Sequence, residues 1–359
     1  MRRTPLILIA LTLFPMAPPA SAAASPDPLG SGTTTLTLAA PFKRLLASHG
    51  VSLNAIAPAS HRASAYSLPL AAGDVDPTSS HLSIESGGVL AFTRAHRTVI
   101  LRRLNVKTAQ VPLIAKVGGG QLKLASAAHR SFSRQGFDSD FQATGLRLTA
   151  KLATRLSKKL ALHDVFKQGQ LLGGVHTTVE PATVAVLPQG GITFTPDPAF
   201  LAKLDKLFVS LNPIAPAERA PGPTFTVPFI PAGTIAPDAS SGVPRSGGSL
   251  EFLQLGAGQV FWHELWFDLG AHQVLAEVDI EPTPTFPGKL GQIQVAGLGP
   301  GAASADPRAR TVSLTGAPLT LSAQIAAAFN EAFAKPQGKG DVFQPNEALG
   351  AISFTAQTH

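Results

Sequence analysis

The sequence contains no cysteine. A chain without cysteine cannot form a disulfide framework, hold zinc or an iron–sulfur cluster through thiolates, or use a thiol nucleophile. It also lacks the cysteine that bacterial lipoproteins acylate, so we expect no lipid anchor of that kind. Charge is scarce as well: 14% of the residues are charged and 44% are hydrophobic, which leaves enough apolar material for a sizeable core.

Motifs that carry catalysis or bind metal are also missing. We find no nucleophile elbow, phosphate-binding loop or dinucleotide fingerprint. The ten histidines form no closely spaced pair, and His263-Glu264 lacks the second histidine of a zinc-protease helix. Asp-x-Asp pairs at 74–76 and 138–140 lack the pattern of a calcium loop. We therefore expect neither an enzyme nor a metal site.

The first residues have the pattern of a secretory signal peptide. A basic start is followed by a nine-residue, almost unbroken apolar run at 6–14 and then by small residues. That run is shorter than the roughly 20 residues a membrane-crossing helix needs, and no later run is longer. We expect residues 1–24 to be cleaved and 25–32 to be a linker. The mature chain, without a transmembrane segment, should be secreted or held at the cell envelope.

Positive charge is modest once the signal peptide is gone. The loss of two arginines leaves 27 Lys and Arg against 22 Asp and Glu. The densest basic group lies within residues 147–167 and includes Lys151, Arg155, Lys158 and Lys159. It is either the solvated face of a helix, which we favour, or a surface for an anionic partner such as a wall polymer. Nucleic-acid binding would require a stronger basic stripe with interleaved aromatic residues, so we expect no such partner.

The chain repeats itself at a spacing of about 160 residues. VSLNAIAPA at residues 51–59 recurs as VSLNPIAPA at 209–217, with eight identities in nine. Ser-Gly-Gly at 86–88 recurs at 246–248, and other matching segments keep the same order along the chain. Because such repeats mark duplicated structural units, we predict two copies of one domain, at residues 33–188 and 189–359.

Each copy has the pattern of many short strands and a few short helices. Residues 33–38 alternate Thr and Leu, and residues 113–124 place three glycines between apolar runs, as in a hairpin. Residues 41–49 begin with Pro and stop at Gly50, and leucines recur every four residues from 152 to 160, as in helices. The expected fold class is mainly β: two tandem copies of a β-sandwich or open-barrel-like domain, each with one or two short helices.

Both tryptophans lie in the strand predicted at residues 260–268. Strict alternation would put Trp262 and Trp266 on one face and His263 on the opposite, mostly apolar face. Two exposed tryptophans beside acidic residues would make a stacking platform for a sugar, a planar macrocycle or a partner protein. Packing between the two domains, or a deeper core in the second copy, is the alternative, and we favour it.

Three segments of the first copy carry a family resemblance. They are PFKRLL at 41–46, SLPL at 67–70 before a glycine turn, and the stretch from IESGGVLAF to VILRRLNVKTAQVPLIAKV at 84–117. Together they resemble the HtaA domain of actinobacterial haem-acquisition proteins, over most of each copy. The resemblance implies a β-rich secreted domain that binds haem at the cell surface or in the envelope.

The residues that the resemblance would assign to haem are replaced in this chain. The family's iron-ligating tyrosine belongs to the first helix, where this chain has leucine and lysine at 45–46 and 203–204. The supporting histidine of the family's glycine turn is absent from residues 85–88 and 245–248. The one tyrosine, Tyr66, lies on the next strand, and we retain Tyr66 and His263 as candidate haem ligands.

Two functions remain open from the sequence. The first is an exported, non-catalytic tandem-domain binding protein for haem or a similar planar hydrophobic ligand, with Tyr66, Trp262, His263 and Trp266 as the ligand-binding residues. The second is a structural or interaction protein of the cell envelope that keeps an HtaA-like fold without a cofactor. Its partner would be a wall polymer or an envelope protein.

Overall fold

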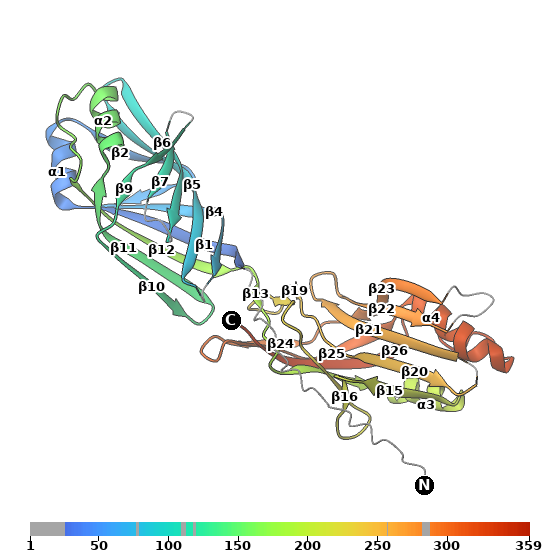
Figure 1. Cartoon of the computed structure of the whole chain (residues 1–359). Helices are drawn as coiled ribbons and strands as arrows, with labels where there is room; N and C mark the ends of the chain where they lie inside the picture. Colours follow the sequence, from blue (N-terminus) through green and yellow to red (C-terminus); the bar gives the residue numbers. More distant parts are fainter. Residues whose placement is uncertain (1–25, 77–78, 109–112, 118–119, 257, 282–287) are drawn as a thin grey trace, which may run out of the picture.

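The computed structural model of the chain describes residues 26–359 except 77–78, 109–112, 118–119, 257 and 282–287. The predicted signal peptide lies outside the described residues. The described chain is mainly β, with two nearly closed barrel-like sheets and four short α-helices. The predicted fold class is therefore confirmed. Figure 1 shows the two sheets as separate lobes that meet near β13.

The first lobe spans residues 27–181 and holds two helices, α1 (Ala40–Ser48) and α2 (Ala150–Lys159). Its strands are β1 (Asp27–Leu38), β2 (Ser52–Ile56), β3 (Ser60–Arg62), β4 (Ala65–Asp76), β5 (His81–Arg94), β6 (Arg97–Lys107), β7 (Ile114–Val117), β8 (Gly120–Lys123), β9 (Ala125–Ser126), β10 (His129–Gln135), β11 (Asp138–Leu148) and β12 (Leu171–Pro181). They form one antiparallel sheet in the order β10-β11-β12-β1-β4-β5-β6-β7-β8, with β2, β3 and β9 paired to β5, β4 and β11.

The second lobe spans residues 191–357 and holds α3 (Pro198–Lys206), α4 (Ala323–Phe329) and two short turns of helix, Asn330–Ala334 and Lys335–Gln337. The strands of its main sheet are β14 (Gly191–Pro196), β15 (Val209–Ile214), β16 (Glu218–Arg219), β17 (Phe225–Pro228), β20 (Ser249–Gln254), β21 (Gly258–Asp268), β22 (Gln273–Ile280), β23 (Lys289–Leu298), β24 (Ala302–Asp306), β25 (Thr311–Leu321) and β26 (Ala348–Gln357). Their order is β15-β20-β21-β22-β23-β25-β26-β14-β17-β16, with β24 beside β25. A small sheet joins β13 (Val184–Ala185), β18 (Thr234–Ile235) and β19 (Gly242–Val243).

The helices begin where short polar side chains cap them or where proline opens them. Thr149 Oγ1 accepts from the Leu152 N–H at 3.2 Å at the start of α2, and an Asp197 carboxylate oxygen accepts from the Ala199 N–H at 2.7 Å at the start of α3. Proline at residue 41 opens α1, as the sequence predicted. Both helices predicted in the first copy, at 41–49 and over the leucines of 152–160, are therefore confirmed.

Aromatic packing forms the centre of the second lobe. The Phe329 ring lies 4.7 Å from that of Phe252, 5.2 Å from that of Phe343 and 5.9 Å from that of Trp262, nearly parallel to the last. Phe329 is completely buried. Aromatic side chains bury the largest apolar areas. Phe329 is therefore the main contact by which the helical segment after β25 packs against the sheet.

A β-bulge interrupts the same pair of strands in each lobe. Residues 87–88, two glycines of β5, stand opposite the single residue Arg103 of β6. Residues 247–248, the corresponding glycines, stand opposite Glu264 of β21, where the pairing is offset in the same way. Arg103 and Glu264 have φ of 50° and 44°, in the left-handed region. The repeated Ser-Gly-Gly segment therefore forms a bulge in the first lobe, inside a long strand.

The bulge shifts which residues of β21 face the core. After Glu264 the alternation restarts one residue out of step, because β21 holds one extra residue against β22: residues 264 and 265 stand opposite the single residue Ala276. Trp262, Leu265 and Phe267 consequently point inward, while His263 and Trp266 lie on the outer face. The predicted face assignment, with the two tryptophans together, is wrong for this reason.

The first strand begins earlier than the predicted linker allows. β1 starts at Asp27, where its Cα pairs with that of Val75 in β4. The Asp27 carboxylate also accepts a hydrogen bond from the Ala185 N–H of β13 at 3.2 Å. Most of residues 25–32 therefore belongs to the sheet, because pairing with β4 orders this segment.

We expect Asp27 to make folding stability depend on pH. Burial raises the pKa of Asp27 from 3.8 to about 6, against the lowering effects of the Ala185 N–H and of Arg134. The folded state therefore favours the protonated form, so this contribution to the free energy of unfolding is complete below pH 3.8 and is lost as the pH rises through about 6. Asp27→Asn stays neutral, so its stability relative to the natural chain should increase from pH 4 to pH 7 in chemical denaturation. A difference that stays constant over this range would contradict the assignment.

Candidate functional site

The four residues selected from the sequence do not form one site. Tyr66 lies in β4 of the first lobe, whereas Trp262, His263 and Trp266 lie in β21 of the second lobe. The bulge further separates the two tryptophans onto opposite faces of β21.

Trp262 is part of the core and Trp266 is not. Trp262 is 3% exposed and packs against the rings of Phe252 and Phe329. Trp266 is half-buried on the outer face, where the Arg245 guanidinium lies 4.9 Å from the centre of its ring. The two tryptophans therefore do not share one face, and the favoured alternative, a deeper core in the second copy, describes Trp262.

Both ring nitrogens of His263 already have polar neighbours on the outer face of β21. Nδ1 lies 2.8 Å from the Ser249 hydroxyl, and Nε2 lies 3.4 Å from a carboxylate oxygen of Asp279. The ring stacks on that of Phe261 at 5.4 Å. This arrangement ties the imidazole to the neighbouring strands β20 and β22 of the sheet.

Tyr66 is buried, and its hydroxyl is engaged. Its side chain is 5% exposed, its hydroxyl donates to the Leu53 carbonyl at 3.1 Å, and the His61 ring stacks on it at 4.3 Å. Burial raises the pKa of the Tyr66 hydroxyl. Iron is held by tyrosine in some haem proteins, but here the phenol stays protonated and bridges β4 to β2.

In the second lobe, a different pair of residues forms the corresponding link between neighbouring strands. Leu211 corresponds to Leu53 at a spacing of 158, and its carbonyl accepts from Nη2 of Arg219 at 2.8 Å. The Arg219 guanidinium lies 4.9 Å from the centre of the Phe225 ring. Arg219 and Phe225 are cross-strand partners, just as His61 and Tyr66 are. A cation on an aromatic ring thus replaces a stacked pair of aromatic rings.

A groove of about 480 Å³ opens at this position, between the two outermost strands of the second sheet. That volume falls within the range of small-molecule sites. Its lining combines apolar side chains, the exposed Arg219 and a few polar groups from α3, β15 and the β16–β17 region: Leu201, Ala202, Leu204, Asp205, Val209, Ser210, Leu211, Asn212, Arg219, Pro223 and Phe225.

Sequence reasoning missed this groove. In the repeat, His61 corresponds to Arg219 and Tyr66 to Phe225. The replacement of both members of such a pair indicates a site only once the contact between them is known. The useful signal was the exchange of an aromatic ring for a cation at a position that is otherwise scaffold.

The groove residues fit part of a haem molecule and do not fit its iron. The lining contains no tyrosine, histidine, methionine or cysteine, the side chains that hold haem iron in most proteins. Among the residues that the structure describes, no three His, Asp or Glu side chains gather to hold a metal ion. Arg219 can donate to a carboxylate, and the apolar lining can take a flat hydrocarbon body. Coordination of iron at this groove is therefore not supported.

In the part of the chain that the structure covers, none of the helices combines the length and apolar character that crossing a bilayer requires.

Comparison with solved structures finds domains of HtaA from Corynebacterium glutamicum. The C-terminal domain matches with 13% identity and a TM-score of 0.34, over 43% of this chain and 98% of that one. The N-terminal domain matches with 16% identity and a TM-score of 0.34, over 47% of this chain and 97% of that one. No protein-family model and no curated protein matches the sequence.

Proposed function

We propose that this chain is an exported, non-catalytic binding protein, and that the groove beside Arg219 takes a flat or elongated organic molecule with a carboxylate. The observation that carries the proposal is the position of Arg219. Its guanidinium lies on the buried Phe225 ring and lines a groove whose apolar part comes from leucine, valine and proline, with Asp205, Ser210 and Asn212 among its polar groups. A cation fixed above an apolar lining matches an amphipathic anion.

The geometry of Arg219 favours a carboxylate partner. One of its five N–H donors is used by the Leu211 carbonyl, which holds the guanidinium in place. The remaining donors can form a charge-assisted, two-pronged pair with a carboxylate. A porphyrin with propionate groups, the class that the resemblance to haem-acquisition domains implies, combines this carboxylate with a flat apolar body.

Because the groove supplies no iron ligand, we expect metal-free protoporphyrin to bind about as tightly as haemin. Titrations of the chain with each compound, followed by porphyrin absorbance and by tryptophan fluorescence, measure the two affinities. Arg219→Gln should weaken both by about 10- to 100-fold, since a hydrogen bond to a charged group contributes about 1.5–3 kcal/mol.

Arg245→Gln is the matched control. Arg245 also lies 4.9 Å from an aromatic ring of the second lobe, that of Trp266, but it does not line the groove. Its substitution should leave both affinities unchanged. Equal losses in the two variants, or no saturable binding of either porphyrin, would overturn the proposal. The second outcome would favour the other function considered from the sequence, a structural or interaction protein of the envelope.

A further inference from the structure

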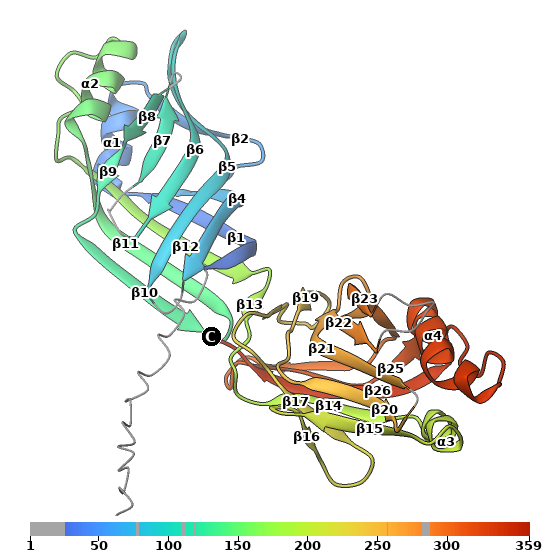
Figure 2. The same ribbon diagram turned by 45° about the vertical axis from the view of Figure 1, so that its right-hand side comes forward.

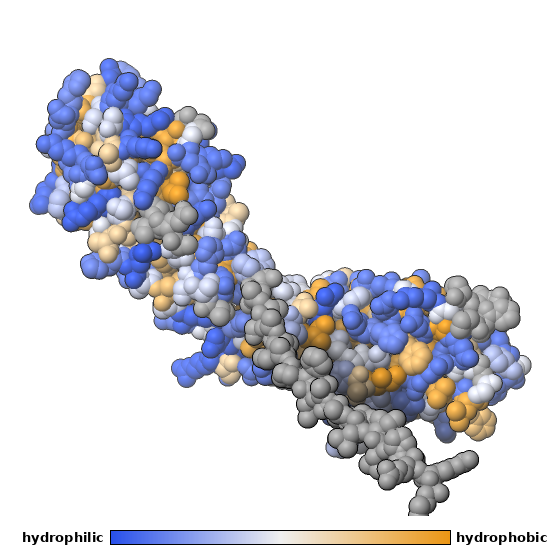
Figure 3. Space-filling model, viewed as in Figure 1, coloured by the Kyte–Doolittle hydropathy of each residue, from blue (hydrophilic) through white to orange (hydrophobic). Residues whose placement is uncertain are grey.

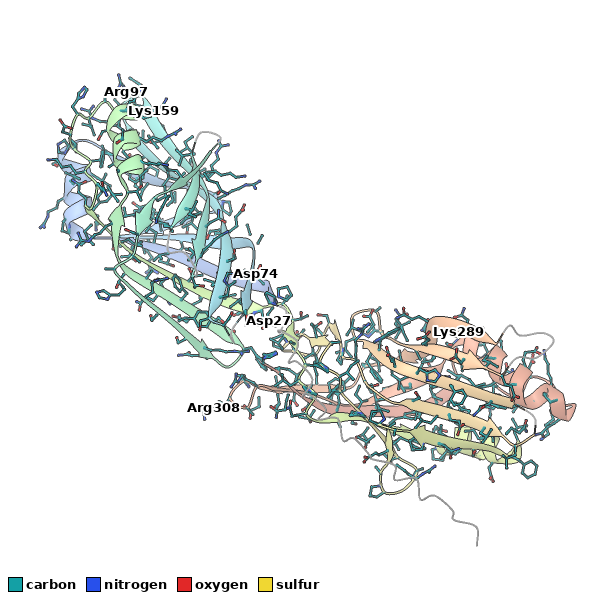
Figure 4. All side chains as sticks on the ribbon, viewed as in Figure 1. Asp27, Asp74, Arg97, Lys159, Lys289 and Arg308 are labelled. Atoms are coloured by element: carbon teal, nitrogen blue, oxygen red, sulfur yellow. The ribbon has the colours of Figure 1, made fainter. Side chains whose placement is uncertain are left out.

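The two lobes carry opposite net charge, although the net charge of the whole chain is positive. Residues 26–188 contain 18 Lys and Arg against 8 Asp and Glu, and residues 189–359 contain 9 against 14. In the first lobe, moreover, acidic residues such as Asp27 and Asp74 lie near the second lobe, while Arg97 and Lys159 lie at the far end (Figure 4). The excess of positive charge therefore belongs to the first lobe, and we call its far end, which includes Arg97 and Lys159, the basic end.

Helix α2 forms the centre of this basic end. Its sequence, AKLATRLSKK, contains four cations and no acidic residue. It packs against β6 and β8, with β7 between them (Figure 2), and these three strands also contain basic but no acidic residues. Figure 3 shows hydrophilic surface over most of this end of the lobe.

A groove of about 630 Å³ runs along the exposed side of α2. Its lining consists of Leu122 from β8 and six residues of the helix: Ala150, Lys151, Thr154, Arg155, Lys158 and Lys159. None of these four cations takes part in an ion pair among the described residues. Residues four apart on a helix rise by about 6 Å, so the groove presents a row of positive charges at roughly that interval.

The ordinary explanation, a solvated helix face, does not account for this row. Lys158 and Lys159 do stabilise the helix, because they lie in its last turn near the negative end of the dipole. Lys151 lies in the first turn, where a cation is unfavourable, and Lys151–Arg155 and Arg155–Lys159 are like-charge pairs at i,i+4. Helix α4 of the second lobe, AQIAAAF, contains no charged residue, so the fold does not require this row.

We propose that the α2 groove binds a linear polyanion, a chain that carries phosphate or carboxylate groups at short intervals. A linear polymer fits a groove with a row of cations better than the flat surface of a bilayer does. Membrane binding would also require exposed apolar side chains, and the groove contains none of the exposed large hydrophobic residues of the described chain: Ile56, Leu171, Phe208 and Leu255. The groove lining contains no aromatic ring on which a base could stack, so a polymer without bases is favoured over nucleic acid.

The test measures binding of inorganic polyphosphate and of poly-γ-glutamate to the full chain by fluorescence anisotropy. The variant Lys151→Gln/Arg155→Gln/Lys158→Gln/Lys159→Gln should lose at least about tenfold in affinity, and the natural chain should lose tens of fold between 50 and 200 mM salt, because about four counterions are released. Glutamine is a good helix former, so circular dichroism should show the fold retained.

The control removes the same charge from the other lobe, with Lys206→Gln/Lys289→Gln/Arg308→Gln/Lys339→Gln, and should bind the polymers as the natural chain does. Preference for polyphosphate or for poly-γ-glutamate identifies the anionic group. Equal losses in the two variants would overturn the proposal. So would binding to phosphatidylglycerol vesicles without binding to either polymer, or a clear preference for single-stranded DNA of equal charge. The groove beside Arg219 is left intact in both variants, so this result is independent of porphyrin binding.

Discussion

Phe329→Ala is expected to lower the free energy of unfolding of the second lobe by about 3–5 kcal/mol. The Phe329 side chain is completely buried, and its ring contacts those of Phe252, Phe333 and Phe343 within 5.5 Å. Alanine would remove this contact area and leave a cavity that the surrounding rings cannot fill, because each ring is held by its own part of the backbone: Phe252 by β20, Phe333 by the helical turn after α4 and Phe343 by the loop before β26. The loss is a large fraction of the stability of an ordinary domain.

Urea unfolding followed by tryptophan fluorescence measures this effect directly. Both tryptophans lie in β21, so the signal reports on the second lobe. Phe208→Ala is the matched control, since Phe208 is 82% exposed and its removal should change stability by less than about 0.5 kcal/mol. A Phe329→Ala protein that unfolds at the same urea concentration as the natural chain would show that the aromatic cluster does not stabilise the lobe.

Gly248→Ala is expected to have the second-largest effect, a loss of about 2–5 kcal/mol from backbone strain and steric overlap. Gly248 has φ of +87°, and a Cβ there would lie 2.5 Å from the backbone nitrogen of Ala217. The left-handed conformation costs an alanine about 1–2 kcal/mol, and the overlap adds about 1–3 kcal/mol because backbone cannot move aside as a side chain can. The same holds at Gly88, where the Cβ would lie 2.6 Å from the nitrogen of Ala59.

Gly270→Ala controls for the loss of a glycine in the same lobe. A Cβ at Gly270 would have its nearest neighbour at 3.7 Å, an ordinary contact. Its substitution should leave the urea midpoint nearly unchanged. If Gly248→Ala were equally neutral in the fluorescence-detected transition, the bulge would not need its glycine, and the repeated pair would have no structural explanation.

The sequence by itself determined the fold class, the duplication and the helices of the first copy. Alternating Thr and Leu in β1, proline before α1 and leucines every four residues in α2 are local signals, and each depends only on neighbours along the chain. The repeat added long-range information, because two copies that keep the same order must keep the same scaffold.

Only the tertiary structure decided which side chains face the core and which can meet a ligand. One left-handed residue, Glu264, shifts the alternation of β21 by one position, and its local sequence contains no sign of this. The repeated glycines at 247–248 did contain the signal, but they lie just before the neighbouring strand β20, and their role is clear only once β20 and β21 are paired. The Arg219 groove and the unpaired cations of α2 depend likewise on which elements pack together, because a site is a property of distances between residues that are far apart in the chain.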